Sequence, residues 1–147
     1  MMLITTSRKP SRNTRVFART LSNLLPNSVY VPRGKGSVES MVEGASAKGL
    51  KRVAVVHDSK GNPGKISLIE NRKDGWDWAE EIPIAGIVLT KPVKKQYTEA
   101  SCEDRKLAEV LAVEPVEDAE LSLVKRPGAI EFVSGKEKLL VIKTGGK

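Results

Sequence analysis

Apolar and polar positions in the first sixty residues follow two different periods. Short runs rich in β-branched residues occur at 3–6 and 29–31, and residues 52–57 include the unbroken apolar stretch Val-Ala-Val-Val. These runs predict strands, and the last predicts a central strand covered on both faces. Between them, residues 11–25 and 38–48 carry apolar side chains at helical spacing. The pattern predicts a β-α-β-α-β arrangement.

The first predicted helix, about residues 11–25, has two faces of different character. Pro10 and Ser11 supply its start. Its apolar residues gather on one side of a helical projection: Phe17, Leu21, Leu24 and Leu25. Its basic residues gather nearly opposite: Arg12, Arg15 and Arg19. We therefore expect one face to pack on the core and the other to present positive charge to solvent.

The second predicted helix, about residues 38–48, has Ser37 as its N-cap and Gly49 just past its end. The remainder of the chain is dominated by predicted strands, with the Asp-Gly pair at 74–75 as a hairpin signal. The strands are expected near residues 65–70, 76–82, 84–90, 121–125, 129–133 and 138–143. A further helix is expected at about 101–113, with Ser101 and Asp104 as a capping pair.

These elements predict an α/β protein, in the sense of an α+β mixed sheet, that forms a single domain over residues 1–147. The sequences at 3–10 and 87–92 share a Thr-rich strand end followed by Lys-Pro, and each precedes a predicted helix. This echo suggests two related halves, about 1–82 and 83–147, although chance similarity explains so short a match equally well.

Positive charge is concentrated near the start of the chain. The net charge is +7, and residues 1–37 contain seven Lys or Arg and no Asp or Glu. This distribution indicates a surface for a polyanion, with an ordinary solvated face as the alternative. We expect a cytoplasmic protein, since neither a membrane-spanning run nor a secretory leader is present. One Cys and one His predict no disulfide, metal site or cofactor.

Two segments are candidate phosphate-binding sites. The first combines a helix start with the basic residues Arg8, Lys9, Arg12, Arg15 and Arg19. Unpaired backbone N–H groups at the helix start would add to the attraction for an anion, whereas the alternative is a helix with ordinary solvated arginines. The second segment is the glycine-rich loop with Arg33 and Lys35, for which a flexible turn is equally plausible. In a parallel arrangement this loop would lie beside the first segment.

Other chemistry-bearing residues give weaker signals. We expect Trp76 and Trp78 to pack on the core rather than stack on bases. The pair His57-Asp58 lacks a nucleophile at a recognisable spacing, which favours a hydrogen-bonded histidine at a strand end over a small catalytic site. Cys102, in the first turn of a predicted helix, is expected to have a lowered thiol pKa and a structural role. No catalytic residue is assigned, and the chain is not expected to be an enzyme.

Residues 4–21, Ile-Thr-Thr-Ser-Arg-Lys-Pro-Ser-Arg-Asn-Thr-Arg-Val-Phe-Ala-Arg-Thr-Leu, resemble the opening motif of the Brix-domain superfamily of ribosome-biogenesis proteins. The resemblance extends through Arg-Gly-Lys-Gly at 33–36, the strand at 53–57 and the turn Gly-Asn-Pro-Gly at 61–64. It is specific over about residues 3–70 and looser afterwards. The branch that it resembles most acts in small-subunit processing with the box C/D guide RNA, and the short chain is similar to archaeal members.

The resemblance implies two halves similar to the anticodon-binding domain of class II aminoacyl-tRNA synthetases. It implies a role in binding precursor ribosomal RNA and assisting its processing or folding, with box C/D guide RNA and ribosome-assembly proteins as further partners and no small-molecule substrate. The RNA-binding residues that it carries over are Arg8, Lys9, Arg12, Arg15 and Arg19, with Arg33 and Lys35 as secondary contacts. The alternative is a protein-interaction adaptor within a ribosome-assembly complex, with incidental RNA contact.

Overall fold

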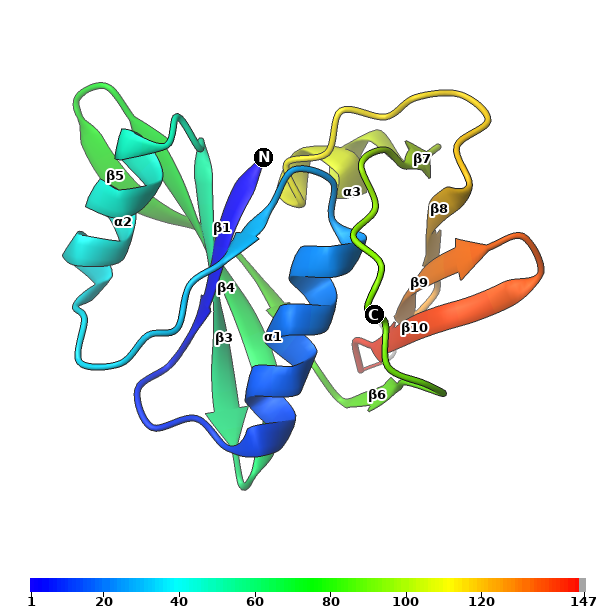
Figure 1. Ribbon diagram of the computed structural model, residues 1–147, viewed down its shortest axis with the longest axis horizontal. Coiled ribbons are helices and arrows are strands. Elements are labelled where there is room, and N and C mark those ends of the chain that lie inside the picture. The colour runs from blue at the N-terminus through cyan, green and yellow to red at the C-terminus, as the bar shows by residue number, and fades with distance from the viewer. Residues whose placement is uncertain (146–147) are drawn as a thin grey trace.

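The computed structural model describes residues 1–145, which form two five-stranded sheets with α1 (Arg12–Leu24) between them (Figure 1). The first sheet has the order β2-β1-β3-β4-β5 and the second has the order β6-β10-β9-β8-β7. Both are mixed sheets, because each contains parallel and antiparallel pairs. The α/β class is confirmed, but the chain forms two mixed sheets where the sequence suggested one.

The first sheet contains β1 (Met2–Thr6), β2 (Val29–Tyr30), β3 (Arg52–Ser59), β4 (Asn62–Arg72) and β5 (Gly75–Pro83). Strands β2, β1 and β3 are parallel, since α1 and α2 (Val38–Ala47) provide the crossovers between them. Strands β3, β4 and β5 are antiparallel and connected by short turns. The predicted β-α-β-α-β start and the hairpin at the Asp-Gly pair are confirmed.

Strand β3 is covered on both faces, as its apolar run predicts. Ala54 and Val56 belong to the core cluster that contains α1. Val53 and Val55 belong to a second cluster with Val42 of α2. Successive side chains of a strand point to opposite faces, so the same strand supports one helix on each side.

Helix α1 connects the two sheets through its apolar face. Phe17 is 1% exposed and shares one core cluster with Ile4 of the first sheet and with Phe132 and Leu140 of the second. The opposite face of the helix is therefore the only one left for solvent. Ser11 is the N-cap, and the helix ends at Leu24, within one residue of the prediction.

The second sheet contains β6 (Gly86–Val88), β7 (Ser101–Cys102), β8 (Leu121–Arg126), β9 (Ala129–Ser134) and β10 (Glu137–Lys143). The predicted helix at 101–113 is wrong in its first part, because these residues form β7 and the helix α3 spans only Arg105–Val110. Asp104 is the N-cap, and its carboxylate accepts a hydrogen bond from Leu107 N at 2.9 Å. Ser101 does not cap the helix; its hydroxyl donates to Val116 O at 2.8 Å instead.

Helices of the described part of the chain are too short or too polar to cross a membrane.

Candidate functional site

The outer face of α1 carries three exposed arginines. Arg12, Arg15 and Arg19 all lie on the solvent side of the helix, as the helical spacing predicts. Arg15 Nη1 donates to the carbonyl oxygen of Pro10 at 3.1 Å, and the Arg19 guanidinium lies 5.4 Å from the centre of the Tyr30 ring. These contacts orient the two side chains without neutralising their charge.

The loop between β1 and α1 extends this positive surface. Arg8 and Lys9 are both exposed, and Lys9 has a left-handed backbone with φ of 53°. We call the five basic residues the α1 cationic surface: Arg8, Lys9, Arg12, Arg15 and Arg19. Within residues 1–145, every ion pair lies outside residues 1–37. The charge of this surface is therefore available to an external anion.

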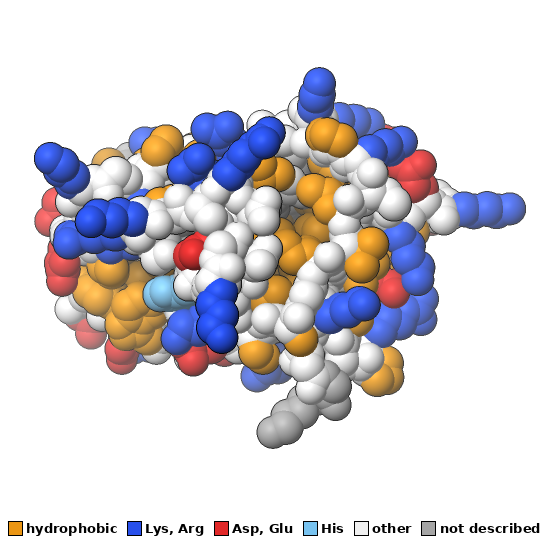
Figure 2. All heavy atoms as spheres, turned by 90° about the horizontal axis from the view of Figure 1, so that it is seen from below, with side chains coloured by type: hydrophobic (Ala, Val, Ile, Leu, Met, Phe, Trp, Pro, Cys, Tyr) orange, Lys and Arg blue, Asp and Glu red, His pale blue; other side chains and the backbone are white. Residues whose placement is uncertain are grey.

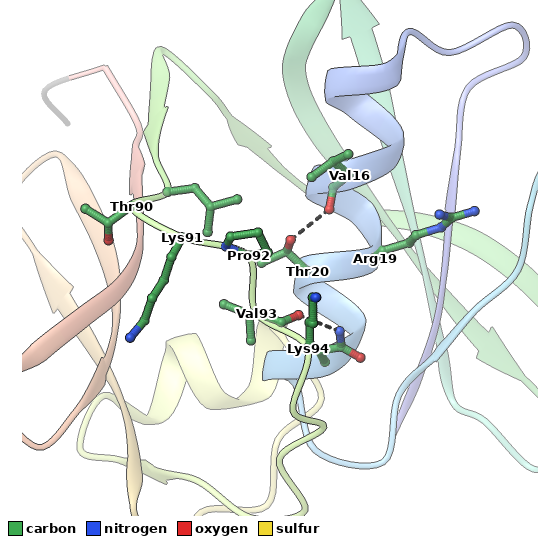
Figure 3. A pocket seen from close by; sticks show the side chains of 10 residues that line it. Val16, Arg19, Thr20, Thr90, Lys91, Pro92, Val93 and Lys94 are labelled. Carbon is green, nitrogen blue, oxygen red and sulfur yellow. Dashed lines mark hydrogen bonds between the residues drawn. The ribbon is translucent and has the colours of Figure 1, made fainter.

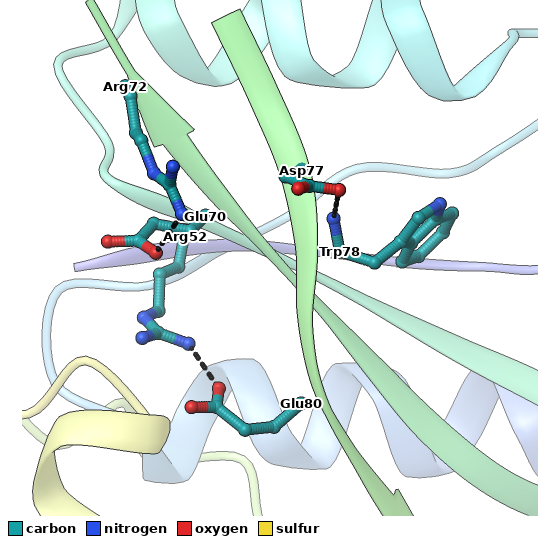
Figure 4. Close-up of polar contacts among 6 residues, drawn as sticks. All are labelled: Arg52, Glu70, Arg72, Asp77, Trp78 and Glu80. Atoms are coloured by element: carbon teal, nitrogen blue, oxygen red, sulfur yellow. Dashed lines mark hydrogen bonds and ion pairs between the residues drawn. The ribbon is translucent and has the colours of Figure 1, made fainter.

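Several acidic residues elsewhere in the described part of the chain form ion pairs. On the first sheet, Arg52 of β3 contacts Glu80 of β5 at 2.9 Å, and Arg72 contacts Glu70 within β4 at 3.2 Å (Figure 4). On the second sheet, the largely buried Glu131 contacts both Arg126 and Lys138. Several basic residues outside the first part of the chain thus have carboxylate partners, whereas none of those on the α1 cationic surface has one within residues 1–145.

The start of α1 is occupied by a carboxylate of the protein itself. Asp58, at the end of β3, accepts hydrogen bonds from Ser11 N at 3.3 Å, from Ser11 Oγ at 2.5 Å and from the Thr14 hydroxyl. The Ser11 and Thr14 hydroxyls are the main reason that the pKa of Asp58 lies below its usual value. This carboxylate brings negative charge to the helix start and engages Ser11 N, which opposes the binding of phosphate by the N–H groups there. The basic side chains are therefore the stronger candidates to bind an anion.

The glycine-rich loop after β2 lies beside this surface, as the parallel arrangement predicts. Arg33 Nη1 donates to Thr6 O at the end of β1 at 3.0 Å, and Arg33 Nε donates to Gly36 O at 2.7 Å. Burial, with a smaller contribution from nearby Arg8, lowers the pKa of Arg33. Arg33 thus holds the loop in place, while Lys35 is exposed on the same loop.

The weaker candidates behave differently from expectation. His57 Nε2 is buried and has no hydrogen-bond partner among the described residues, so the expected satisfied histidine is not observed. Burial, and next the nearby Lys65, lower the pKa of His57, which keeps the imidazole neutral at pH 7. Asp58 is bound to α1 rather than to His57, so the two residues do not form a catalytic pair.

Trp76 is partly buried and packs against the cluster under α2, as expected, but Trp78 is 48% exposed, so its predicted packing is wrong. The indole of Trp78 points away from the ion pairs of the hairpin (Figure 4).

Cys102 lies in β7 rather than in a helix, and burial raises the pKa of its thiol, which contradicts the expected lowering. The described residues contain no group of three His, Cys, Asp or Glu that could hold a metal ion.

Two adjoining hollows lie beside α1, with volumes of about 640 and 610 Å³. Val16 of α1 and Leu89 line both of them. In the first hollow, Val16, Thr20 and Arg19 come from α1, and Lys91 and Lys94 come from the segment after β6 (Figure 3). Seen from below, apolar side chains are visible in a hollow near the middle of the molecule, with Lys and Arg side chains further out on both sides (Figure 2).

Sequence comparison finds archaeal relatives named "Probable Brix domain-containing ribosomal biogenesis protein". The chain is 36% identical over 91 residues to that of Pyrococcus abyssi, covering 62% of this chain and 41% of the relative. It is 36% identical over 93 residues to that of Thermococcus kodakarensis, covering 63% and 45%. The chain thus spans less than half the length of these curated relatives. No protein-family model matches it.

A eukaryotic relative also matches. The U3 small nucleolar ribonucleoprotein protein imp4 of Schizosaccharomyces pombe is 39% identical over 67 residues, which is 46% of this chain and 23% of the relative.

Two solved structures share the fold over nearly the whole chain. A structure described as a "probable ribosomal biogenesis protein" from Aeropyrum pernix K1 superimposes with a TM-score of 0.76 and 23% identity, covering 98% of this chain and 96% of the other. Mil, an archaeal Imp4-like protein, gives a TM-score of 0.72 and 23% identity, covering 98% and 97%. At this identity the structural matches establish the fold alone.

Proposed function

We propose that this chain, a homologue of archaeal Brix domain-containing ribosomal biogenesis proteins, is an RNA-binding factor of ribosome biogenesis. Its α1 cationic surface binds the phosphates of precursor ribosomal RNA and assists the processing or folding of that RNA. The single observation that carries the proposal is an exposed cluster of five basic residues without ion-pair partners in residues 1–145.

The chemistry of the surface suits a phosphate backbone. Each guanidinium is planar, stays charged at all physiological pH values and donates two parallel hydrogen bonds to phosphate oxygens. Arg12, Arg15 and Arg19 are spaced by three and four residues, so their side chains lie on one face of α1. Successive phosphates of one RNA segment can therefore meet successive arginines of the helix.

Because Arg33 is engaged by two backbone carbonyls, its main role in this proposal is to hold the glycine-rich loop against the end of β1. Lys35, exposed on that loop, is a secondary phosphate contact. Contacts to the phosphate backbone carry little sequence information. Selectivity therefore comes from RNA shape and unpaired segments.

The proposal extends to the organisation and partners of the chain. It treats residues 1–147 as one Brix domain with halves of about 1–82 and 83–147, related to the anticodon-binding domain of class II aminoacyl-tRNA synthetases. The division at about residue 83 is supported by the two sheets, which contain β1–β5 and β6–β10 respectively. The name of the fission yeast relative supports a ribonucleoprotein setting. We further propose box C/D guide RNA and ribosome-assembly proteins as partners. We propose a cytoplasmic location and no catalytic role.

The proposal is tested by replacing Arg12, Arg15 and Arg19 together with Glu. These side chains are exposed, so the variant should keep the wild-type circular dichroism spectrum and thermal unfolding, while its affinity for precursor ribosomal RNA should fall beyond detection. The matched control replaces Arg105, Lys106 and Lys136 with Glu. These are also exposed, form no ion pair in the described part of the chain, and change the net charge equally.

Loss of RNA binding in the α1 variant with retention in the control supports the proposal. Unchanged RNA affinity in a folded α1 variant overturns it. Crosslinking in cells, followed by sequencing of the bound RNA, should recover precursor ribosomal RNA with the wild-type protein. Partner proteins that remain bound after nuclease treatment, combined with unchanged RNA affinity of the variant, would instead favour the adaptor role.

A further inference from the structure

We propose that the groove formed by the two hollows beside α1 binds an unpaired nucleotide of the RNA, with its base on the apolar floor and its phosphate on the basic rim. This inference rests on the proposed function and adds a second kind of contact to it. The α1 cationic surface binds the backbone, whereas the groove distinguishes unpaired RNA from duplex.

The floor of the groove is apolar and accessible. Val16, on the solvent side of α1, is 40% exposed and lines both hollows. Facing it are Ile87, Leu89, Pro92 and Val93 from β6 and the segment that follows. Asn23 Nδ2 donates to Val93 O at 2.8 Å, which fixes that segment to α1. A direct hydrogen bond therefore joins the two sides of the groove.

The rim is basic on both sides. On α1, Arg12 and Arg19 are lining residues, with the Arg19 guanidinium directed toward the Tyr30 ring and away from the opposite segment (Figure 3). Lys91 and Lys94 border the groove on that opposite segment. Lys91 contacts Glu137 at 3.0 Å, which leaves Arg12, Arg19 and Lys94 without an ion pair in residues 1–145. Neither hollow has an acidic lining residue in that range. An apolar floor with an acid-free basic rim matches a ligand that joins a flat apolar ring to an anion, which is the chemistry of a nucleotide.

The size and position of the groove favour an unpaired base. Both hollows fall within the roughly 300–1,000 Å³ typical of pockets that take small organic molecules. The bases of a duplex are stacked inside the helix, so only a splayed-out base can enter such a concavity. Arg12 and Arg19 belong both to the groove and to the α1 cationic surface, so one RNA segment can contact the two together.

An acidic peptide is the alternative ligand, and the structure provides fewer contacts for it. Strand addition at the neighbouring sheet edge would rely on β6, which spans only Gly86–Val88. Three residues provide few backbone groups for a peptide strand to pair with. The basic rim is continuous with the five residues of the α1 cationic surface. RNA carries one negative charge per nucleotide, so it matches this extended surface better than an isolated acidic side chain of a peptide does.

The test makes the floor of the groove polar without changing charge. Val16→Gln replaces the apolar side chain by an amide, and Val116→Gln, at a position that is also 40% exposed but lies outside the groove, is the matched control. Fluorescence anisotropy measures binding of a labelled oligouridylate and of an RNA duplex, each about 12 nucleotides long. Val16→Gln should weaken single-strand binding about tenfold and leave duplex binding unchanged, while Val116→Gln should change neither.

A second measurement locates the contact. An oligouridylate that carries 4-thiouridine, irradiated in complex with the wild-type protein, should crosslink to peptides that contain Val16 or Leu89. Three results would each overturn the groove proposal. One is wild-type single-strand affinity in a folded Val16→Gln variant, and another is crosslinks confined to other segments. The third is Val16-dependent binding of an acidic peptide but not of RNA. Absence of any RNA binding by the wild-type protein would instead remove the proposed function itself, so the two failures are distinguishable.

Discussion

Replacing Ser11 with Ala removes the N-cap of α1 and a link between that helix and the turn that joins β3 to β4. Ser11 Oγ accepts a hydrogen bond from Thr14 N at 3.3 Å, and it lies 2.5 Å from Asp58 Oδ1 and 3.0 Å from Gly61 O. The substitution therefore leaves one helical N–H without its acceptor, and it removes one of the donors to the Asp58 carboxylate, which keeps Thr14 Oγ1 and the backbone N–H groups of Ser11 and Gly61. The helix that carries the arginines should be less firmly held at its start.

The magnitude follows from these contacts. Loss of a Ser N-cap typically destabilises a protein by about 0.5–2 kcal/mol. The additional contacts to Asp58 and Gly61 place Ser11→Ala near the upper end, about 2 kcal/mol. For a chain of this length, that corresponds to a fall in Tm of about 4–8 °C.

Ser37→Ala is the matched control, because Ser37 caps α2 by accepting from Ser40 N at 3.1 Å and has no carboxylate contact among the described residues. Its expected fall in Tm is about 2–4 °C. Differential scanning calorimetry measures both, and hydrogen exchange at the Thr14 amide should accelerate in Ser11→Ala. Equal losses of Tm in the two variants would refute the reasoning, since the Asp58 link would then contribute nothing.

Three further predictions concern the fold and its titrating groups. The pKa of Asp58 is lower in the folded protein than in the unfolded chain, so its contribution to stability is complete above about pH 4 and is lost as the pH falls further. The Tm difference between wild type and Asp58→Asn should therefore shrink in acid. A Tm difference that is constant with pH would contradict this prediction. Phe17→Ala should destabilise the protein by about 3–5 kcal/mol in chemical denaturation, while Val16→Ala on the exposed side changes stability by about 0.5 kcal/mol or less. The raised pKa of Cys102 predicts slow alkylation by iodoacetamide at pH 7 and faster alkylation in urea; equal rates would count against it.

Local patterns predicted the elements whose structure depends on local contacts. The helical spacing of Phe17 and Leu21 against Arg12, Arg15 and Arg19 was sufficient to predict both faces of α1. Ser11 and Ser37 are the caps that their residue types favour. The Val-rich run of β3 also predicted a strand between two helices, which the two core clusters confirm.

Elements that depend on distant partners were predicted less well. The edge strand β6 pairs with β10, more than fifty residues away, and no local pattern reports which strands share a sheet. Strand β7 consists of two residues paired in parallel with β8, so its extended backbone depends on that partner. Asp104 competes with Ser101 for the helix start, and the contact of Ser101 with Val116 determines which residue becomes the cap.

In the candidate site, too, the features that depend on local spacing were predicted and those that depend on distant residues were not. The exposed arginines follow from the helical repeat, so the sequence predicted their positions. The binding of Asp58 to the start of α1 joins residues more than forty positions apart, and only the parallel pairing of β1 with β3 could have indicated it. The groove likewise combines α1 with a segment about seventy residues later, and the sequence alone contained no signal for it.

The salt dependence of RNA affinity tests most directly the claim that α1 binds the RNA backbone. On single strands, log affinity should fall with log salt concentration by about 0.7 for each phosphate contact, so five contacts predict a slope of about −3.5. The variant with both Arg12→Ala and Arg15→Ala should bind more weakly at low salt, and its slope should be less steep by about 1.4. An identical slope for the wild type and the double variant would contradict the account.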